Sequence, residues 1–223
     1  MPESPPPTPW DFALDRAQSG EDLVGLGADL EVATLHAAYS VGVFPMGVGE
    51  HGAPPIGWWS PDPRGVLRLG DLRVSRSLRK AAKHFEIRVD TAFDDVVAGC
   101  ADPDREGRWI TTEVTDAYAE LHAAGWAHSI ETWQDDRLVG GLYGVAIGGL
   151  FAGESMFHTA RDASKVALVG LHELLSDGHP DRLIDVQWRT DHLATLGVTE
   201  VPRETYRELL GRALRVPLPR PWR

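Results

Sequence analysis

Hydrophobic side chains recur at helical spacing through much of the chain. Leu78, Ala81 and Phe85 follow one such pattern after Ser75, a residue type that caps helices well, and predict a helix over residues 75–85. Similar patterns predict further helices over residues 29–40, 93–100, 112–124, 163–176, 191–196 and 203–214. Gly42 is placed to end the first of these helices in the left-handed conformation.

Between residues 127 and 157 the helical spacing gives way to alternation of hydrophobic and polar positions. The alternation predicts three strands over residues 127–134, 138–147 and 150–157, joined by turns at Asp135-Asp136 and Gly148-Gly149. A further strand is predicted over residues 182–188. An antiparallel meander with helices before and after it is typical of the α+β class, here with a central, mainly antiparallel sheet flanked by helices.

The segment from Gly42 to Pro63 is dense in glycine and proline and predicts a loop. We expect this loop to join a small N-terminal domain, residues 1–70, to a main domain, residues 71–223. The first nine residues include five prolines and predict a disordered tail.

The composition limits the class of protein. The chain has 223 residues, 43% of them hydrophobic, and no apolar run approaches the roughly 18 residues that a membrane span needs. The N-terminus lacks the pattern of a secretory signal, and Cys100 is the single cysteine, so no internal disulfide is possible. We expect a cytoplasmic protein that does not bind membranes.

The charge is segregated along the sequence. The net charge of −11 argues against a general binder of polyanions. The segment Arg73–Arg88 nevertheless has a net charge of +5, and the segment Arg203–Arg223 has +4. A charged helix face is often only solvated, but clustered like charges destabilise a helix, which favours a polyanionic partner as the alternative.

Polar residues on two predicted strands are candidates for chemistry. Asp185 and Gln187 stand two apart, so a strand places both on one face, either solvated or lining a cleft where they could orient a nucleophile. Glu154 lies among small and apolar residues, where a buried salt bridge and a cation-binding pocket are equally good explanations.

Three tryptophans fall outside the periodic apolar faces. Trp58, Trp59 and Trp109 either attach loops to the core or form the wall of a pocket on which a base could stack. The nine histidines are scattered, and none of their spacings predicts a metal site.

Nine short segments, taken in order, resemble those of the bacterial leucyl/phenylalanyl-tRNA–protein transferases. The segments are Ala38–Pro45, Trp58–Arg64, Trp109–Thr111, His128–Glu131, Gly140–Val145, Gly153–Phe157, Ala163–Lys165, Leu183–Gln187 and Asp191–Gly197. Several unusual strings in one order, from about residue 30 to residue 200, are far more specific than any single motif. The family often has tryptophan at the position of Met46 and methionine at that of Leu142.

The resemblance implies an enzyme that moves leucine, phenylalanine or methionine from aminoacyl-tRNA to proteins beginning with Arg or Lys. The product is marked for degradation by the N-end rule. The resemblance also implies a C-terminal domain similar to the N-acetyltransferase fold, and it places Glu154, Asp185 and Gln187 around the reacting groups. The pocket for the transferred side chain is implied to consist of Trp109, Leu142, Phe151, Met156, Leu171 and Ile184.

The implied chemistry is simple, because an aminoacyl ester is already activated and needs no ATP, cofactor or metal. The attacking α-amine has a pKa of about 7.7–8.0, so roughly a tenth of it is neutral at pH 7. Placement of the amine against the ester can then supply much of the acceleration. We hypothesise that Gln187, polarised by Asp185, positions the amine, and that Glu154 holds a cationic group.

The basic segment then has a role in gripping tRNA phosphates. The residues expected to do so are Arg73, Arg76, Arg79, Lys80 and Lys83. Two other functions remain as alternatives: an acetyl-CoA-dependent N-acetyltransferase and a non-catalytic RNA-binding protein. The first lacks support at residues 137–142, which do not match the pyrophosphate loop of such enzymes.

Overall fold

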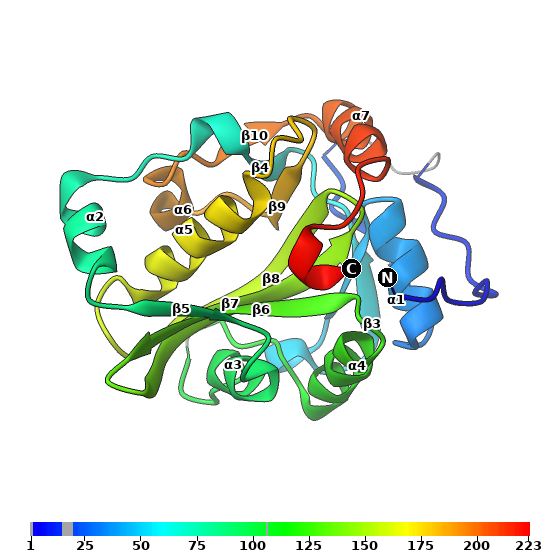
Figure 1. Cartoon of the computed structure of the whole chain (residues 1–223). Helices are drawn as coiled ribbons and strands as arrows, with labels where there is room; N and C mark the ends of the chain where they lie inside the picture. Colours follow the sequence, from blue (N-terminus) through cyan, green and yellow to red (C-terminus); the bar gives the residue numbers. More distant parts are fainter. Residues whose placement is uncertain (1, 15–19, 106) are drawn as a thin grey trace.

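The computed structural model describes residues 2–14, 20–105 and 107–223, which form a seven-stranded sheet, a three-stranded sheet and the helices around them (Figure 1). The strands of the larger sheet lie in the order β10-β4-β9-β8-β7-β6-β5. Their bounds are β4 Arg64–Arg68, β5 Glu86–Val89, β6 Ala127–Gln134, β7 Arg137–Ile147, β8 Leu150–His158, β9 Leu183–Gln187 and β10 Thr199–Val201. Neighbouring strands are antiparallel except for β8 and β9, which run parallel.

The strands β6, β7 and β8 form the predicted meander. Asp135 and Asp136 turn the first hairpin with φ of 50° and 56°, as a type I′ turn requires, and Gly148 turns the second with φ of 60°. Each strand begins and ends within one residue of its predicted range. The prediction of the meander is confirmed. A long alternation of hydrophobic and polar residues between turn residues is set by neighbouring positions, so it can be recognised without knowledge of distant contacts.

Helices cover both faces of the larger sheet. α5 (Ala163–Leu175) lies on one face, and α3 (Phe93–Cys100) and α4 (Thr112–Ala123) lie on the other (Figure 1). The other helical segments described are α1 Val32–Ser40, α2 Arg76–Ala82, α6 Asp191–Ala194, α7 Arg203–Ala213 and 3-10 turns over Glu50–Gly52, Leu69–Asp71 and Arg220–Trp222. A mostly antiparallel sheet flanked by helices confirms the α+β class. None of the helices described has both the length and the apolar composition needed to cross a membrane.

The prediction of a loop between Gly42 and Pro63 is wrong. This stretch contains β2 (Phe44–Gly47) and β3 (Ile56–Trp59), which form a three-stranded sheet with β1 (Leu23–Leu26) in the order β1-β3-β2. Pro45 is tolerated because β2 is an edge strand, where a missing N–H breaks no ladder on the open side. Pairing with a distant strand therefore overrides the local preference of glycine and proline for turns.

The predicted helix over residues 75–85 is shorter than expected. Ser75 caps it as predicted, because its hydroxyl accepts a hydrogen bond from the Leu78 N–H at 3.1 Å. The helix α2 ends at Ala82, since the chain turns to pair β5 with β6 at the edge of the sheet. The apolar spacing continues to Phe85, but the edge strand decides where the helix stops.

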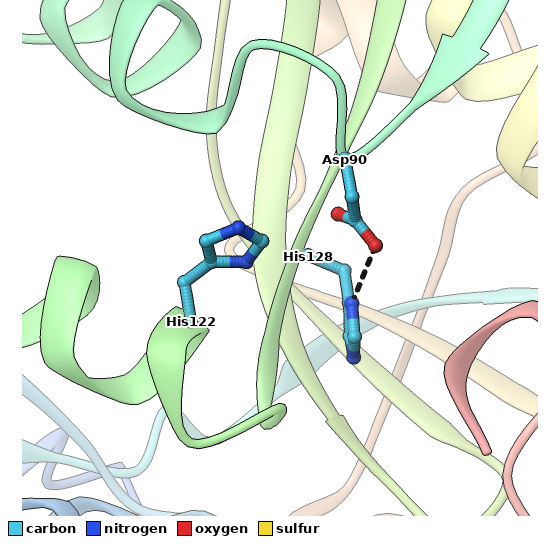
Figure 2. Close-up of side chains that lie close together, drawn as sticks. All are labelled: Asp90, His122 and His128. Carbon is cyan, nitrogen blue, oxygen red and sulfur yellow. Dashed lines mark hydrogen bonds and ion pairs between the residues drawn. The ribbon is translucent and has the colours of Figure 1, made fainter.

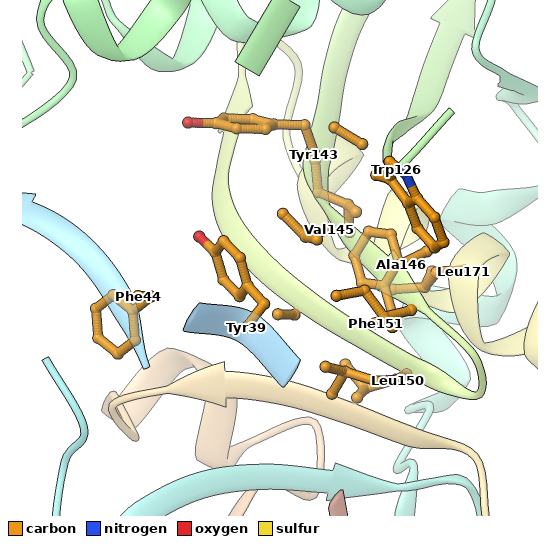
Figure 3. Close-up of a cluster of buried hydrophobic side chains, with 14 of the residues drawn as sticks. Tyr39, Phe44, Trp126, Tyr143, Val145, Ala146, Leu150, Phe151 and Leu171 are labelled. Carbon is orange, nitrogen blue, oxygen red and sulfur yellow. The ribbon is translucent and has the colours of Figure 1, made fainter. Parts of the chain in front are cut away.

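The core lies between the sheet and its helices. Figure 3 shows Tyr143 and Val145 of β7 with Phe151 of β8 and Tyr39 of α1 in one apolar cluster. The strand β4 precedes residue 71 yet belongs to the larger sheet, between β10 and β9. The N-terminal part is thus attached to the larger sheet through β4, the strand next to the edge strand β10.

Candidate active site

A cavity of about 400 Å³ lies beside β8 and β9. All six residues that the resemblance implied for an aminoacyl pocket line it: Trp109, Leu142, Phe151, Met156, Leu171 and Ile184. Its wall is predominantly apolar. Glu154 and Gln187 bring polar groups to it, as do Arg105, Ser155, Thr190 and His192. The arrangement suits an uncharged side chain next to a small polar centre.

Other cavity residues were missed by the sequence analysis. Phe44 and Met46 of β2, Trp188 after β9 and Leu193 of α6 also line the cavity. The alternation of Ile184, Val186 and Trp188 contained a signal for Trp188. Phe44 and Met46 lie in the segment predicted to be a loop, so their positions on either side of Pro45 were not recognised as one face of a strand.

Glu154 is held on the cavity wall by neutral hydrogen-bond donors. The Tyr118 hydroxyl donates to its Oε2 at 3.0 Å, and Gln187 Nε2 donates to its Oε1 at 2.8 Å. The Tyr39 hydroxyl bonds to that of Tyr118 in turn. Burial raises the pKa of Glu154 to about 7, and these hydrogen bonds oppose the rise only in part. A buried salt bridge therefore does not explain this carboxylate.

Gln187 ends β9 with a φ of 63°, in the left-handed region that residues other than glycine rarely adopt. The turn interrupts the strand's alternation, so Gln187 reaches the same cavity as Ile184 and Val186. The expectation that Asp185 and Gln187 share one face is wrong, and the solvated alternative is excluded. Gln187 is 6% exposed, while Asp185 is fully buried and absent from the cavity wall.

Asp185 is instead the centre of a buried ion pair. It accepts two hydrogen bonds from Arg64, at 2.8 and 2.6 Å, and one from the Tyr206 hydroxyl at 2.7 Å. Burial alone would lower the pKa of Arg64, but the facing charge of Asp185 outweighs burial and the pKa is raised. Asp185 reaches Gln187 only through the main chain, since its Oδ1 accepts from the Gln187 N–H at 2.9 Å.

The hypothesis that Asp185 polarises the side chain of Gln187 is not supported, because no hydrogen bond among the described residues joins the two side chains. The side-chain amide of Gln187 bonds to Glu154, and Asp185 fixes the backbone on which that amide stands. The two carboxylates have separate tasks: Glu154 faces the cavity and Asp185 shapes the chain behind it.

The three tryptophans divide between the two alternatives. Trp58 is 2% exposed and belongs to the core, and the indole N–H of Trp59 donates to the carbonyl of Met46 at 2.9 Å within the small sheet. Both lie on β3 and attach it to its neighbours. Trp109 lines the cavity and is the one of the three that forms its wall.

The basic side chains in and before α2 lie on the surface, where Arg79 Nη2 donates to the carbonyl of Val74 at 2.9 Å. The residues Arg73, Arg76, Arg79, Lys80 and Lys83 are all exposed. The N–H of Arg73 donates to the carbonyl of Leu196 at 2.9 Å, just beyond α6, whose Leu193 lines the cavity. The positive segment is therefore attached next to the cavity.

Asp90, His122 and His128 gather at the start of β6, with one potential ligand atom of each within 4.8 Å of the others (Figure 2). His128 Nδ1 bonds to Asp90 Oδ2 at 2.8 Å, and His122 Nδ1 bonds to the carbonyl of Ala127 at 2.7 Å. A ring nitrogen that donates to an oxygen has no lone pair for a metal. In this arrangement the cluster fastens the loop after β5 to β6.

The segment His128–Glu131, one of those that carry the resemblance, has a structural role. The Glu131 carboxylate accepts hydrogen bonds from the N–H groups of Thr91 and Ala92, from the Ser129 hydroxyl and from the Trp133 indole. It therefore holds the loop before α3 and is not available to the cavity.

Comparison with known proteins agrees with this geometry. Residues 66–211 match the family described as leucyl/phenylalanyl-tRNA protein transferase, and residues 28–62 match the N-terminal domain of the same family. The chain belongs to this family.

Individual relatives show how far the similarity extends. A leucyl/phenylalanyl-tRNA–protein transferase of Pectobacterium carotovorum is 49% identical over 195 residues, which cover 85% of this chain and 80% of the relative. The Oleidesulfovibrio alaskensis protein of the same name is 48% identical, with 93% of this chain and 86% of the relative covered. Among solved structures, that of L-PGS from Bacillus licheniformis is 11% identical and has a TM-score of 0.38. It covers 72% of this chain and 54% of that chain, a likeness too weak to carry an argument.

Proposed function

We propose that the chain moves leucine, phenylalanine or methionine from aminoacyl-tRNA to the α-amine of proteins that begin with Arg or Lys. Membership of the family makes it an aminoacyl-tRNA–protein transferase. The observation that carries the proposed site is the hydrogen bond between Gln187 and Glu154 on the wall of a mostly apolar cavity.

The size and lining of the cavity support these three amino acids. Leucine, phenylalanine and methionine are uncharged and gain free energy by leaving water for an apolar wall, at about 25 cal/mol per Å² buried. A lysine or aspartate side chain would lose hydration against this mostly apolar wall. Trp109 then contacts the aminoacyl group or the terminal adenosine.

The reaction requires little beyond placement. The amine nitrogen of the acceptor attacks the ester carbonyl, a C–N bond forms, and the bond from carbon to the ribose oxygen breaks. The amine loses a proton and the ribose oxygen gains one, so the step is balanced without an external reagent. Holding the two groups in contact is worth several kcal/mol of barrier.

Gln187 is placed to direct the amine. Its Nε2 is engaged by Glu154, and no hydrogen bond among the residues described engages its Oε1. That oxygen accepts an N–H of the attacking amine and turns its lone pair toward the ester. The left-handed backbone of Gln187 is a strained feature of the kind that functional sites retain.

Glu154 contributes charge. When ionised, its carboxylate attracts the cationic residue at the start of the acceptor and orients the Gln187 amide at the same time. The exposed basic side chains around α2 grip phosphates of the tRNA near the cavity.

Further parts of the proposal concern the setting of the reaction. Transfer takes place in the cytoplasm and marks the acceptor for degradation. Residues 1–70 and 71–223 act as two domains that share the larger sheet, because β4 of the first belongs to it. The second domain is similar to the N-acetyltransferase fold. The parallel pairing of β8 with β9, after a meander and the crossover helix α5, supports that similarity.

One assay separates the candidate functions. The purified chain is incubated with labelled Phe-, Leu- or Met-tRNA, or with acetyl-CoA, and a peptide that begins with Arg, and the product is identified by mass. We expect aminoacyl addition to the Arg peptide and none to the same peptide with an acetylated N-terminus. Acetyl addition would indicate an N-acetyltransferase, and RNA binding without transfer would indicate a binding protein.

The role of Gln187 is tested by substitution. We expect Gln187→Ala to lower kcat by about 100-fold, in the range of a positioned proton-transfer group, with little change in the KM for tRNA. Gln134→Ala, at the end of β6 and outside the cavity, is the matched control and keeps the wild-type rate. If Gln187→Ala and Asp185→Asn both transferred at the wild-type rate, the assignment would be wrong.

A further inference from the structure

The last ten residues, 214–223, fold against the hairpin between β7 and β8. The Gly149 N–H donates to the carbonyl of Ala213 at 2.8 Å. A Cβ atom at Gly148 would lie 2.7 Å from the Leu214 carbonyl oxygen, and one at Gly149 would lie 2.8 Å from Cβ of Val216. The two glycines therefore allow this C-terminal segment to approach the turn. It lies beyond residue 211, where the family match ends.

The segment places Trp222 behind the cavity wall. Trp222 is 4% exposed, and its ring stacks on that of Phe151 with centroids 5.6 Å apart and planes at 25°. On its other neighbour, His128, it stacks at 4.4 Å and 12°. Phe151 is fully buried and lines the cavity, so Trp222 is one layer behind it.

Phe151 is confined at a second point. A Cβ atom on Gly144 of β7 would lie 2.7 Å from Cε1 of the Phe151 ring, so the ring rests directly against this strand. With Gly144 against one part of the ring and Trp222 against another, the position of Phe151 is set by packing at interior density.

We propose that Trp222 is a positioning residue that sets the depth of the aminoacyl pocket through Phe151. The C-terminal segment thereby influences which amino acid the chain transfers. The inference rests on the proposed function of the cavity, and it adds a selectivity determinant outside the matched part of the chain. Without the indole, the Phe151 ring can move back and the pocket gains room for a larger side chain.

The test compares transfer from Phe-tRNA and Leu-tRNA. For Trp222→Ala we expect the ratio of kcat/KM for phenylalanine to that for leucine to rise at least about threefold, since one methylene group in an apolar pocket already changes selectivity about tenfold or more. Trp222→Phe, which keeps a ring against Phe151, holds the ratio near the wild-type value. Trp126→Ala is the matched control: Trp126 is buried, meets the His36 ring edge to face and does not line the cavity.

The outcomes distinguish positioning from a structural role. If Trp222→Ala lowers transfer of both amino acids equally, or changes neither, the proposal is overturned. Should Trp222→Ala fail to fold, as judged by thermal unfolding, Trp222→Leu takes its place, and an unchanged ratio in that variant overturns the proposal equally.

A binding measurement tests the inference separately from the proposed function. If the wild-type chain transfers nothing, binding of the phenylalanyl and leucyl amides of 3′-amino-3′-deoxyadenosine is measured by calorimetry. A Kd ratio that shifts by about threefold or more in Trp222→Leu and not in Trp126→Ala supports the pocket claim, and a constant ratio overturns it.

Discussion

At the residue scale, Glu154 is a buried carboxyl group whose protonation state changes near neutral pH. Its two hydrogen-bond donors, Tyr118 and Gln187, suit the carboxylate, while burial favours the neutral acid. The balance leaves the pKa at about 7. The group that we propose to face the acceptor therefore titrates in the same range as an attacking α-amine.

This raised pKa predicts a pH-dependent stability. An ordinary glutamate releases its proton at pH 4.5 in the unfolded chain, whereas folded Glu154 retains it up to about pH 7. The folded state binds more protons between these values, so the free energy of unfolding falls as pH rises through this window. The full loss is about 3 kcal/mol, from about 1.4 kcal/mol for each pH unit.

Urea unfolding of wild type and Glu154→Gln at pH 5 and pH 8 measures the effect. The variant should gain about 2.5 kcal/mol relative to wild type between the two pH values, since unfolded glutamate is already largely ionised at pH 5. Glu173→Gln, at an exposed position of α5, should run parallel to wild type. Parallel curves for Glu154→Gln would show that the carboxyl titrates normally.

At the element scale, α2 joins a well-capped start to a strongly charged surface. Ser75 stabilises the first turn by about 1 kcal/mol, which offsets part of the repulsion among the basic side chains. The helix is short, and Leu78 is its one buried side chain. Its exposed face is therefore free to be specialised for a partner.

Charge reversal on α2 should weaken tRNA binding without disabling the chemistry. We expect Arg76→Glu with Arg79→Glu to raise the KM for aminoacyl-tRNA at least about tenfold and to flatten its dependence on salt, because phosphate contacts are lost. The control reverses Arg137 and Arg161, which are exposed elsewhere. Equal tRNA affinity for both double variants in a filter-binding titration would exclude the role of α2.

At the scale of the whole molecule, the buried pair of Arg64 and Asp185 connects distant parts of the chain. Arg64 comes from β4 and Asp185 from β9, and Tyr206 of α7 and the carbonyl of Gly42 complete the cluster. The same Asp185 holds the backbone of Gln187. The contact between β4 and β9 and the placement of the Gln187 backbone thus both involve one carboxylate.

Removing one partner of this pair should be costly. We expect Arg64→Met to lower the free energy of unfolding by about 3–5 kcal/mol, because Asp185 is left buried and unpaired. Arg161→Met, which removes a 95% exposed side chain from its ion pair with Asp162, should cost less than about 1 kcal/mol. Urea denaturation at pH 7 compares the two. Similar costs for both would show that the buried pair is not a central support.

The sequence by itself determined the elements whose pattern is local. The meander, the helices α3, α4 and α5 and the Ser75 cap follow from spacing and turn residues within a few positions of each other. The resemblance supplied the pocket residues, all of which lie on one cavity. Elements predicted by local spacing form in any fold that buries their apolar face.

Only the tertiary structure decided which distant groups meet. Arg64 and Asp185 are 121 positions apart, and Gln187 and Glu154 are 33 apart. β2 and β3 form strands because they pair, although their glycines and prolines favour turns. Trp222 stands behind Phe151 because the C-terminal segment folds back over the hairpin. Hydrogen bonds and packing between remote segments have no period along the chain, and so they become visible only when the chain is folded.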